Sequence, residues 1–289
     1  LQRDGRYRQD KSVTYIYDIF SKKLTEVAPF TVDLLLPSGA ENLNYVLYTD
    51  ESPYKMQREW LDRLPFDIYS VNVHTGAKRL IGRSYRTAPK WSVNGKWAVM
   101  YDPIAQVWNK FDGATGKVVN ISDAIGYPMF MESYDKPAPA PAYGIAGWTA
   151  DGNNVFLYDA YDWWKIDLTG ERQPECLTKG YGRKHGKSIR KMTSNIDKDV
   201  FQKDEKVIVS LWDKDTMDEG VYQLDMKGRL RKLMEGNYVY TIHRFSDNHE
   251  YCVWNRQNVS EFRDLWWSKS DFSNSVKVTN ANPQQADYK

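Results

Sequence analysis

The sequence has few cysteines, no long apolar run and almost no excess of charge. Cys176 and Cys252 are the two cysteines among 289 residues, so disulfide bonds do not organise the fold, and two isolated buried thiols are the simplest interpretation. No run of about 18 apolar residues is present, which argues against a membrane-spanning helix. Forty basic and 38 acidic side chains leave a net charge of +2, which is too small to indicate a nucleic acid partner.

Sequence motifs for metal binding and for hydrolysis are also missing. The pair His249-Glu250 begins a zinc-protease pattern, but Val253 stands where the second histidine is required. The four histidines form no compact ligand set with either cysteine, so we expect no metal and no cofactor. No G-x-S-x-G string provides the strained turn on which a serine nucleophile sits. We therefore expect the chain to carry no catalytic residues of its own.

A basic, glycine-containing stretch at residues 179–188 does not satisfy the phosphate-loop motif. The motif needs a glycine five positions before its Gly-Lys-Ser, and Tyr181 occupies that position. No buried strand is predicted before the stretch and no apolar helix after it, so its amides are not expected to converge on a phosphate. A solvated basic loop is the favoured interpretation.

Aromatic residues are abundant. The chain has 11 Trp and 20 Tyr, and aromatics make up 14% of its residues. They cluster with Val and Ile in short runs separated by turn residues, which predicts an all-β protein. The pairs Trp163-Trp164 and Trp266-Trp267 could stack on a sugar or a peptide, but neighbouring strand residues face opposite sides. One member of each pair is therefore expected in the core.

Residues 143–178 contain one complete structural repeat. The pattern predicts four short strands, at residues 143–148, 155–158 and 163–168 and ending near Cys176. Asp151-Gly152 supplies a hairpin turn between the first two, because Asp bonds the local backbone and Gly allows a positive φ. A four-stranded antiparallel meander in about 36 residues is typical of a propeller blade.

The same pattern recurs along the chain and gives six units, of which the first, within residues 1–28, has only two strands. An insertion at 50–65 interrupts the second unit, and its QREWLDRL segment, residues 57–64, predicts a short helix. A loop at 122–142 ends in alternating Pro and Ala, which bars a central strand and makes a stiff connector. We predict a single β-propeller domain over residues 1–289, built of four-stranded antiparallel blades, with seven or eight blades in the full domain as an open alternative.

Three stretches resemble a known protein family. They are PAPAPAYGIAGW at 137–148, DAYDWWKID at 159–167 and VTNANPQQADY at 278–288. They are similar to the propeller half of bacterial prolyl oligopeptidase and dipeptidyl peptidase IV-type serine peptidases, the S9 family, and the resemblance covers most of the chain from about residue 92. Turn strings such as SVNGK at 92–96 and TADGN at 149–153 also resemble those of TolB-like propellers.

The resemblance implies a fragment of a larger peptidase. In that family the segment similar to residues 279–288 lies just before the α/β-hydrolase domain that carries the Ser, Asp and His, so such a domain is expected after residue 289. This chain would then be a non-catalytic propeller that caps the active site and gates or contacts peptide substrates, in a periplasmic or secreted protein. The dipeptidyl peptidase branch uses a Glu pair to hold the substrate amine, and no adjacent Glu-Glu occurs here. The alternative is a free-standing TolB-like or ligand-binding propeller with no attached enzyme.

Long loops on a rigid scaffold are the places where a propeller is expected to contact peptides. Our candidate contact residues are Glu132, Tyr134 and Asp135, in the loop before the Pro-Ala run, and Arg183 and Lys184, in the basic loop. Ordinary solvated loop residues are the competing interpretation of all five.

Overall fold

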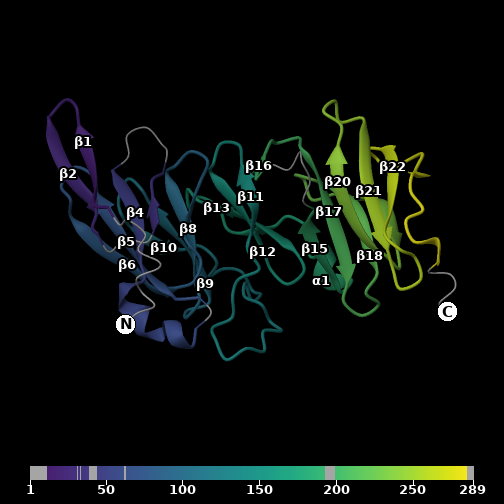
Figure 1. Cartoon of the computed structure of the whole chain (residues 1–289). Coiled ribbons are helices and arrows are strands. Elements are labelled where there is room, and N and C mark those ends of the chain that lie inside the picture. Colours follow the sequence, from purple (N-terminus) through teal and green to yellow (C-terminus); the bar gives the residue numbers. More distant parts are fainter. Residues whose placement is uncertain are drawn as a thin grey trace. The chain divides into compact units, whose positions relative to one another are not determined.

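The computed structural model describes residues 12–30, 32, 34–38, 44–61, 63–192 and 199–284. The chain comprises two compact units, Leu1–Ala142 with Asp151–Asn153, and Tyr143–Ala150 with Asn154–Lys289. Within each unit the strands are grouped into sheets (Figure 1). That residues 1–289 form a single domain stays a prediction.

In the first unit, the part of the chain that the structure describes forms a hairpin and two four-stranded sheets. The hairpin joins β1 (Thr14–Asp18) and β2 (Lys23–Ala28). In both sheets, strands that follow each other in the chain are paired antiparallel. The strands are β3 (Leu34–Leu36), β4 (Tyr45–Asp50), β5 (Phe66–Asn72) and β6 (Lys78–Tyr85), then β7 (Lys90–Trp91), β8 (Trp97–Asp102), β9 (Val107–Asp112) and β10 (Val118–Asn120).

The described residues of the second unit form three sheets and a one-turn helix, α1 (Tyr181–Lys184). The strands of the first sheet are β11 (Ile145–Thr149), β12 (Asn154–Tyr158), β13 (Trp163–Asp167), β14 (Glu175–Cys176) and β16 (Val200–Phe201). Those of the second are β15 (Lys187–Lys191), β17 (Lys206–Asp213), β18 (Glu219–Asp225) and β19 (Leu230–Gly236). Those of the third are β20 (Val239–Phe245), β21 (Tyr251–Gln257), β22 (Asp264–Lys269) and β23 (Val276–Lys277).

These sheets confirm the predicted fold class, an all-β protein built of four-stranded antiparallel propeller blades. The first of the six predicted blades has two strands in the described residues, β1 and β2, as predicted. The Pro-Ala run lies in the connection between β10 and β11 and outside every strand, which agrees with its prediction as a connector.

The strand β16 was not predicted. It pairs parallel with β11, through Trp148 with Val200 and Thr149 with Phe201, although it follows β15 in the chain. The pairing needs a glycine at position 147, because a Cβ there would lie 2.5 Å from the Phe201 ring and 2.8 Å from the Asp199 carbonyl oxygen. A two-residue strand has no alternation by which sequence reasoning could find it.

The predicted helix at residues 57–64 is wrong in place and type. A 3₁₀ helix, η2, runs over Ser52–Glu59, with a proline in its first turn. It ends where the amides of Trp60 and Leu61 both bond to the Gln57 carbonyl oxygen. Trp60 is 70% exposed, so no apolar face is buried here that would extend the helix by further turns.

The cores lie between successive sheets of each unit. In the second unit, Phe156 and Trp163 of the β11 sheet pack with Ile189, Val209 and Leu211 of the β15 sheet. In the first unit, residues of the β3 sheet pack in the same way with residues of the β7 sheet: Leu47, Ile68 and Tyr85 with Ala98, Met100 and Phe111. Alternate apolar residues of each strand therefore face a neighbouring sheet.

Both tryptophan pairs divide between two sides of a strand, as predicted. Trp163 is fully buried, whereas Trp164 is partly exposed. Trp266 stacks on the buried Trp254, and Trp267 is 39% exposed and stacks on Tyr251. Core packing accounts for Trp163 and Trp266.

The thiols of Cys176 and Cys252 are both free. Cys252 is buried as predicted, but Cys176 is half-buried, because β14 lies at the edge of its sheet. None of the helices in the described ranges has the length and apolar character needed to span a bilayer.

Candidate functional site

The second unit contains a network of buried carboxylates around residues 159–162, which we call the 159–162 loop. This loop joins β12 to β13 and contains Asp159 and Asp162, each only 1% exposed. Asp159 Oδ1 accepts backbone N–H bonds from Tyr161 and Asp162, both at 2.6 Å. Such bonds to the second and third following residues define a turn that an aspartate closes with its own side chain.

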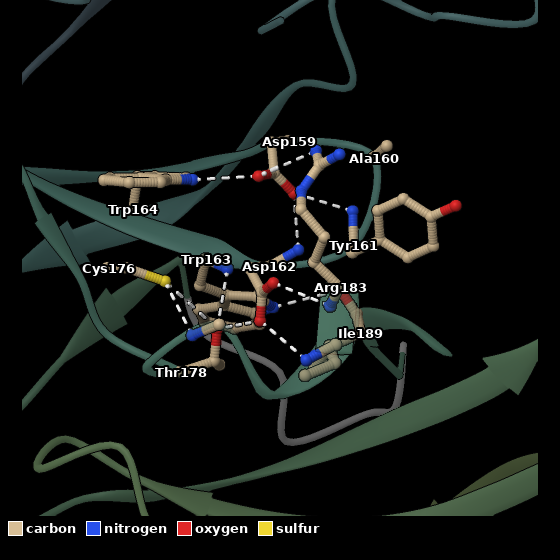
Figure 2. Close-up of polar contacts among 12 residues, drawn as sticks. Asp159, Ala160, Tyr161, Asp162, Trp163, Trp164, Cys176, Thr178, Arg183 and Ile189 are labelled. Carbon is tan, nitrogen blue, oxygen red and sulfur yellow. Dashed lines mark hydrogen bonds and ion pairs between the residues drawn. The ribbon is translucent and has the colours of Figure 1, made fainter. Parts of the chain in front are cut away.

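The second oxygen of Asp159 connects the loop to other elements. Its Oδ2 accepts a bond from Trp164 Nε1 on β13 at 3.1 Å and forms an ion pair with Arg183 Nη2 on α1 at 3.3 Å. Figure 2 shows these contacts converging on one carboxylate. The four donors compensate the desolvation of a buried charge.

Asp162 holds the helix α1 against the loop. Its Oδ1 accepts bonds from Thr178 Oγ1 at 2.6 Å and from the Gly182 amide at 2.8 Å, and its Oδ2 accepts one from the Arg183 amide at 2.9 Å (Figure 2). Thr178 Oγ1 in turn accepts a bond from the Trp163 amide at 3.2 Å. The network therefore joins the start of β13 to the residues before and within α1.

The close approach of α1 to the loop depends on Gly182. A Cβ at this position would lie 2.6 Å from the Tyr161 carbonyl oxygen and 2.7 Å from that of Lys187, both rigid backbone atoms. The buried Trp163 side chain supports the same region, because its Nε1 donates to the Ile189 carbonyl oxygen at 3.1 Å. The sequence thus brings α1, the loop and β15 together through one glycine and one tryptophan.

This framework presents a cation-rich aromatic surface. The guanidinium carbon of Arg183 lies 4.9 Å from the ring centre of Tyr161, and Lys214 Nζ lies 3.9 Å from the same centre. Tyr161 is partly exposed, and the Arg183 side chain is 26% exposed. Lys184, the next residue, is exposed. Such a surface suits anionic or aromatic groups of a ligand.

The structure corrects the interpretation of residues 179–187 as a solvated loop. The stretch contains α1, Gly182 is buried, and Arg183 is tied to the buried Asp159. The half-buried thiol of Cys176 also takes part, because it accepts a bond from the Gly180 amide at 3.2 Å, and burial raises its pKa. Only part of this stretch, including Lys184, is solvated as predicted.

The other candidate residues lie in the first unit. Glu132 and Asp135 are exposed and Tyr134 is partly exposed, in the connection between β10 and β11. A bridge between Phe130 and Ala142 closes the base of this loop. The structure places these three residues in one loop, and Arg183 next to Lys184 in the other unit. Their contact with substrate stays a prediction.

Sequence reasoning missed the residues that build the network. Asp159 and Asp162 lie in the link between two predicted strands, which entered only the family resemblance, and no contact role was assigned to Tyr161 or Lys214. A detectable signal was present, since two aspartates three positions apart border strands of buried residues. Carboxylates in such a position need partners, but the sequence does not say which.

The described residues provide no candidate metal site. No group of three or more His, Cys, Asp or Glu side chains in this part of the chain could hold a metal ion. His243 Nε2 bonds to the Asn255 side chain, and that of His74 bonds to Asn44. The network around Asp159 holds the Arg183 cation near the Tyr161 ring.

The sequence matches no family model and no curated protein. Among solved structures, the chain is similar to TolB from Acinetobacter baumannii, with 14% identity, 92% of this chain and 59% of that chain covered and a TM-score of 0.40. It is also similar to dipeptidyl peptidase 4 from Porphyromonas gingivalis, with 12% identity, coverage of 96% and 44% and a TM-score of 0.49. The β-propeller domain of the Trilobed protease from Pyrococcus furiosus gives 10% identity, coverage of 93% and 87% and a TM-score of 0.31. At these identities the likeness extends no further than the fold.

Proposed function

We propose that this chain is the non-catalytic propeller domain of a serine peptidase of the S9 type, which caps the active site and gates or contacts peptide substrates. The observation that carries the proposal is the surface around Tyr161, where two cations flank an aromatic ring on a base of buried hydrogen bonds. A rigid base lowers the entropy lost when a ligand binds. The proposal is supported by the resemblance of residues 137–148, 159–167 and 278–288 to that family.

The proposed roles assign binding to this chain and chemistry to a hydrolase domain elsewhere in the parent protein. Arg183 and Lys184 are the proposed peptide contacts in the second unit. Glu132, Tyr134 and Asp135 are the proposed contacts in the first.

A free-standing TolB-like or ligand-binding propeller is the second candidate. It is favoured by the turn strings at residues 92–96, 149–153 and 246–250, which resemble those of TolB-like propellers. The coding sequence beyond Lys289 distinguishes the two. A hydrolase-like region with G-x-S-x-G supports the first, and a stop codon contradicts it.

The contact role of Arg183 is tested in the full-length protein with Arg183→Ala and chromogenic peptides. We expect KM to rise roughly three- to tenfold with kcat little changed, because a charge-assisted contact of about 1 kcal/mol is removed from ground state and transition state alike. The matched control is Lys206→Ala, which removes an exposed cation of the same unit outside the network. Equal KM values for the folded Arg183→Ala protein and the wild type would contradict the role of Arg183.

A further inference from the structure

The turn of the β1–β2 hairpin (Figure 1, purple) carries two large apolar side chains that face water. Ile19 is 70% exposed and Phe20 is 91% exposed. Asp18 Oδ1 accepts backbone N–H bonds from Phe20 at 2.9 Å and from Ser21 at 3.2 Å, so a local carboxylate closes the turn. Ile19 and Phe20 therefore gain little free energy from burial in the fold.

Turns of the same kind elsewhere in the chain carry other residues at these two positions. The side-chain oxygen of an Asn or Asp accepts the same two N–H bonds in the turns that join β5 to β6, β9 to β10 and β17 to β18. The two residues that follow it are Val73-His74, Gly113-Ala114 and Lys214-Asp215. The first of each pair is buried or partly buried, and the second is polar or small. The geometry of the turn therefore does not require the exposed Ile19 and Phe20.

The apolar surface continues from the turn onto both strands. Tyr17 of β1 is paired with Leu24 of β2 beside the turn, and both side chains are more than half exposed. Tyr15 lies two residues before Tyr17, on the same side of β1, and is close to half exposed. We call Tyr15, Tyr17, Ile19, Phe20 and Leu24 the tip patch. A contiguous exposed apolar patch marks a contact with a protein or a membrane.

Basic side chains border the tip patch. Lys22 follows in the turn and is exposed, and Lys23 stands opposite Asp18 in the strand pairing. Residues 18–23 hold two lysines and one aspartate, so the turn carries a net positive charge. At the boundary of an anionic bilayer, apolar side chains enter the acyl region, tyrosine rings lie among the headgroups and lysines attract lipid phosphates. The composition of the hairpin end matches all three layers.

We propose that the tip patch inserts into the surface of an anionic lipid bilayer, with Ile19 and Phe20 at the acyl boundary and Lys22 among the lipid phosphates. A stable protein interface needs about 20 to 30 residues on each side. The tip patch has five, and a bilayer surface requires no matching shape, so a weak and reversible attachment is expected. This contact is independent of the proposed function, because the hairpin lies in the first unit, outside the 159–162 loop.

Sedimentation of the chain with lipid vesicles tests this contact. One set of vesicles is made of phosphatidylcholine alone, and the other of phosphatidylcholine mixed with anionic phosphatidylglycerol. We expect the chain to bind the mixed vesicles roughly five- to tenfold more tightly, because the lysines attract the anionic lipid. Added salt should weaken this preference, since it screens the charges.

The decisive variant carries both Ile19→Ser and Phe20→Ser. It should bind the mixed vesicles at least about tenfold more weakly, since two apolar side chains leave the contact. Lys22→Gln should reduce the preference for the mixed vesicles about three- to fivefold. The matched control is Ile104→Ser, which removes a 66% exposed side chain from a turn that Asp102 closes with the same two bonds, and it should bind like the unchanged chain. The substituted side chains are exposed, so each variant should keep the circular dichroism spectrum of the unchanged chain.

The outcomes are separable. Absence of binding to both kinds of vesicle overturns the bilayer contact, and so does equal binding by the double variant and the unchanged chain. An equal loss in Ile104→Ser also overturns it, because any exposed apolar side chain would then serve. Self-association of the chain that the double variant abolishes, without vesicle binding, overturns it in favour of a contact between two copies.

Discussion

Asp159 and Asp213 begin the same kind of turn, but only Asp159 joins distant parts of the chain. In each, Oδ1 accepts backbone N–H bonds from the second and third following residues. Those donors are Tyr161 and Asp162 in one turn and Asp215 and Thr216 in the other. Asp159 Oδ2 additionally accepts from Trp164 and Arg183, and the side chain is almost fully buried.

The difference shows that one local device serves two purposes. An aspartate at the end of a strand can close a turn wherever it occurs, because its carboxylate accepts bonds from backbone N–H groups two and three residues further along the chain. Where the second carboxylate oxygen is also buried, the same residue makes tertiary contacts, since a buried acceptor needs hydrogen-bond donors and these come from other elements. The second use is what fixes Arg183 and Tyr161 at the surface.

The largest effect is expected from Asp159→Ala. It leaves the partly buried Arg183 cation without its counter-charge and Trp164 Nε1 without an acceptor, so the free energy of unfolding should fall by about 3 kcal/mol. Urea denaturation measures the loss. Asp213→Ala is the matched control and should cost clearly less, because it removes an exposed carboxylate that has its local turn bonds and an electrostatic attraction to Lys187 but no buried contacts. Equal losses in the two variants would show that the buried contacts add nothing to the turn.

A somewhat smaller effect is expected from Gly182→Ala, which tests how tightly α1 must approach the loop. The new Cβ would press on two backbone carbonyl oxygens, so the free energy of unfolding should fall by about 2 kcal/mol. Gly126→Ala is the control, because a Cβ there meets no atom within 4 Å, and its change should stay within about 0.5 kcal/mol. A Gly182→Ala protein as stable as the wild type would mean that α1 can move away without cost.

Thr178→Val should reduce the free energy of unfolding less than either of these two substitutions. Valine keeps the shape of the side chain but removes the hydroxyl between Asp162 and the Trp163 amide, so we expect a loss of about 1.5 kcal/mol. Thr169 is the matched exposed case, since its hydroxyl bonds only within its own turn, to Asp167 and to the Glu171 amide. Thermal unfolding of Thr178→Val and Thr169→Val should show the larger drop in Tm for the buried hydroxyl, and the reverse order would contradict the network.

The smallest effect concerns pH. Backbone N–H groups of Thr216 and Asp215 lower the pKa of Asp213 below its usual 3.8. A carboxyl whose pKa is lower in the folded chain stabilises the fold above its ordinary pKa, and this contribution disappears as the pH falls through the folded value. Asp213→Asn should therefore reduce stability at neutral pH and have a diminishing effect as the pH drops below 3.8. Urea unfolding measured across this range tests it, and a difference that grows towards acid would contradict the assigned direction.

Most of the fold could be predicted because local sequence patterns determine its strands and turns. Alternating apolar residues and Asp-Gly turns located β11, β12 and β13 within a residue or two of their bounds. Structures without such a pattern were missed or misplaced. β16 has two residues and pairs with a strand about 50 positions away, and η2 depends on a proline at its start rather than on a buried face.

The candidate site was less predictable, since its bonds join residues that are far apart in sequence. Asp162 and Arg183 are 21 positions apart, and only the pairing of strands brings them within 2.9 Å. The sequence indicated Arg183 and Lys184 as basic residues of a loop, but not the carboxylates beneath them. Arg190 lies on a predicted strand, where its charge gave no sign that two tyrosine rings enclose it.

The parallel pairing of β16 with β11 has a consequence for how the second unit assembles. During synthesis the chain completes β11 to β14, begins the neighbouring sheet with β15, and only then supplies Val200 and Phe201 to the edge of the first sheet. The first sheet cannot reach its final form before part of the second has emerged from the ribosome. We expect the two sheets to gain and lose protection from hydrogen exchange together, as one cooperative folding unit.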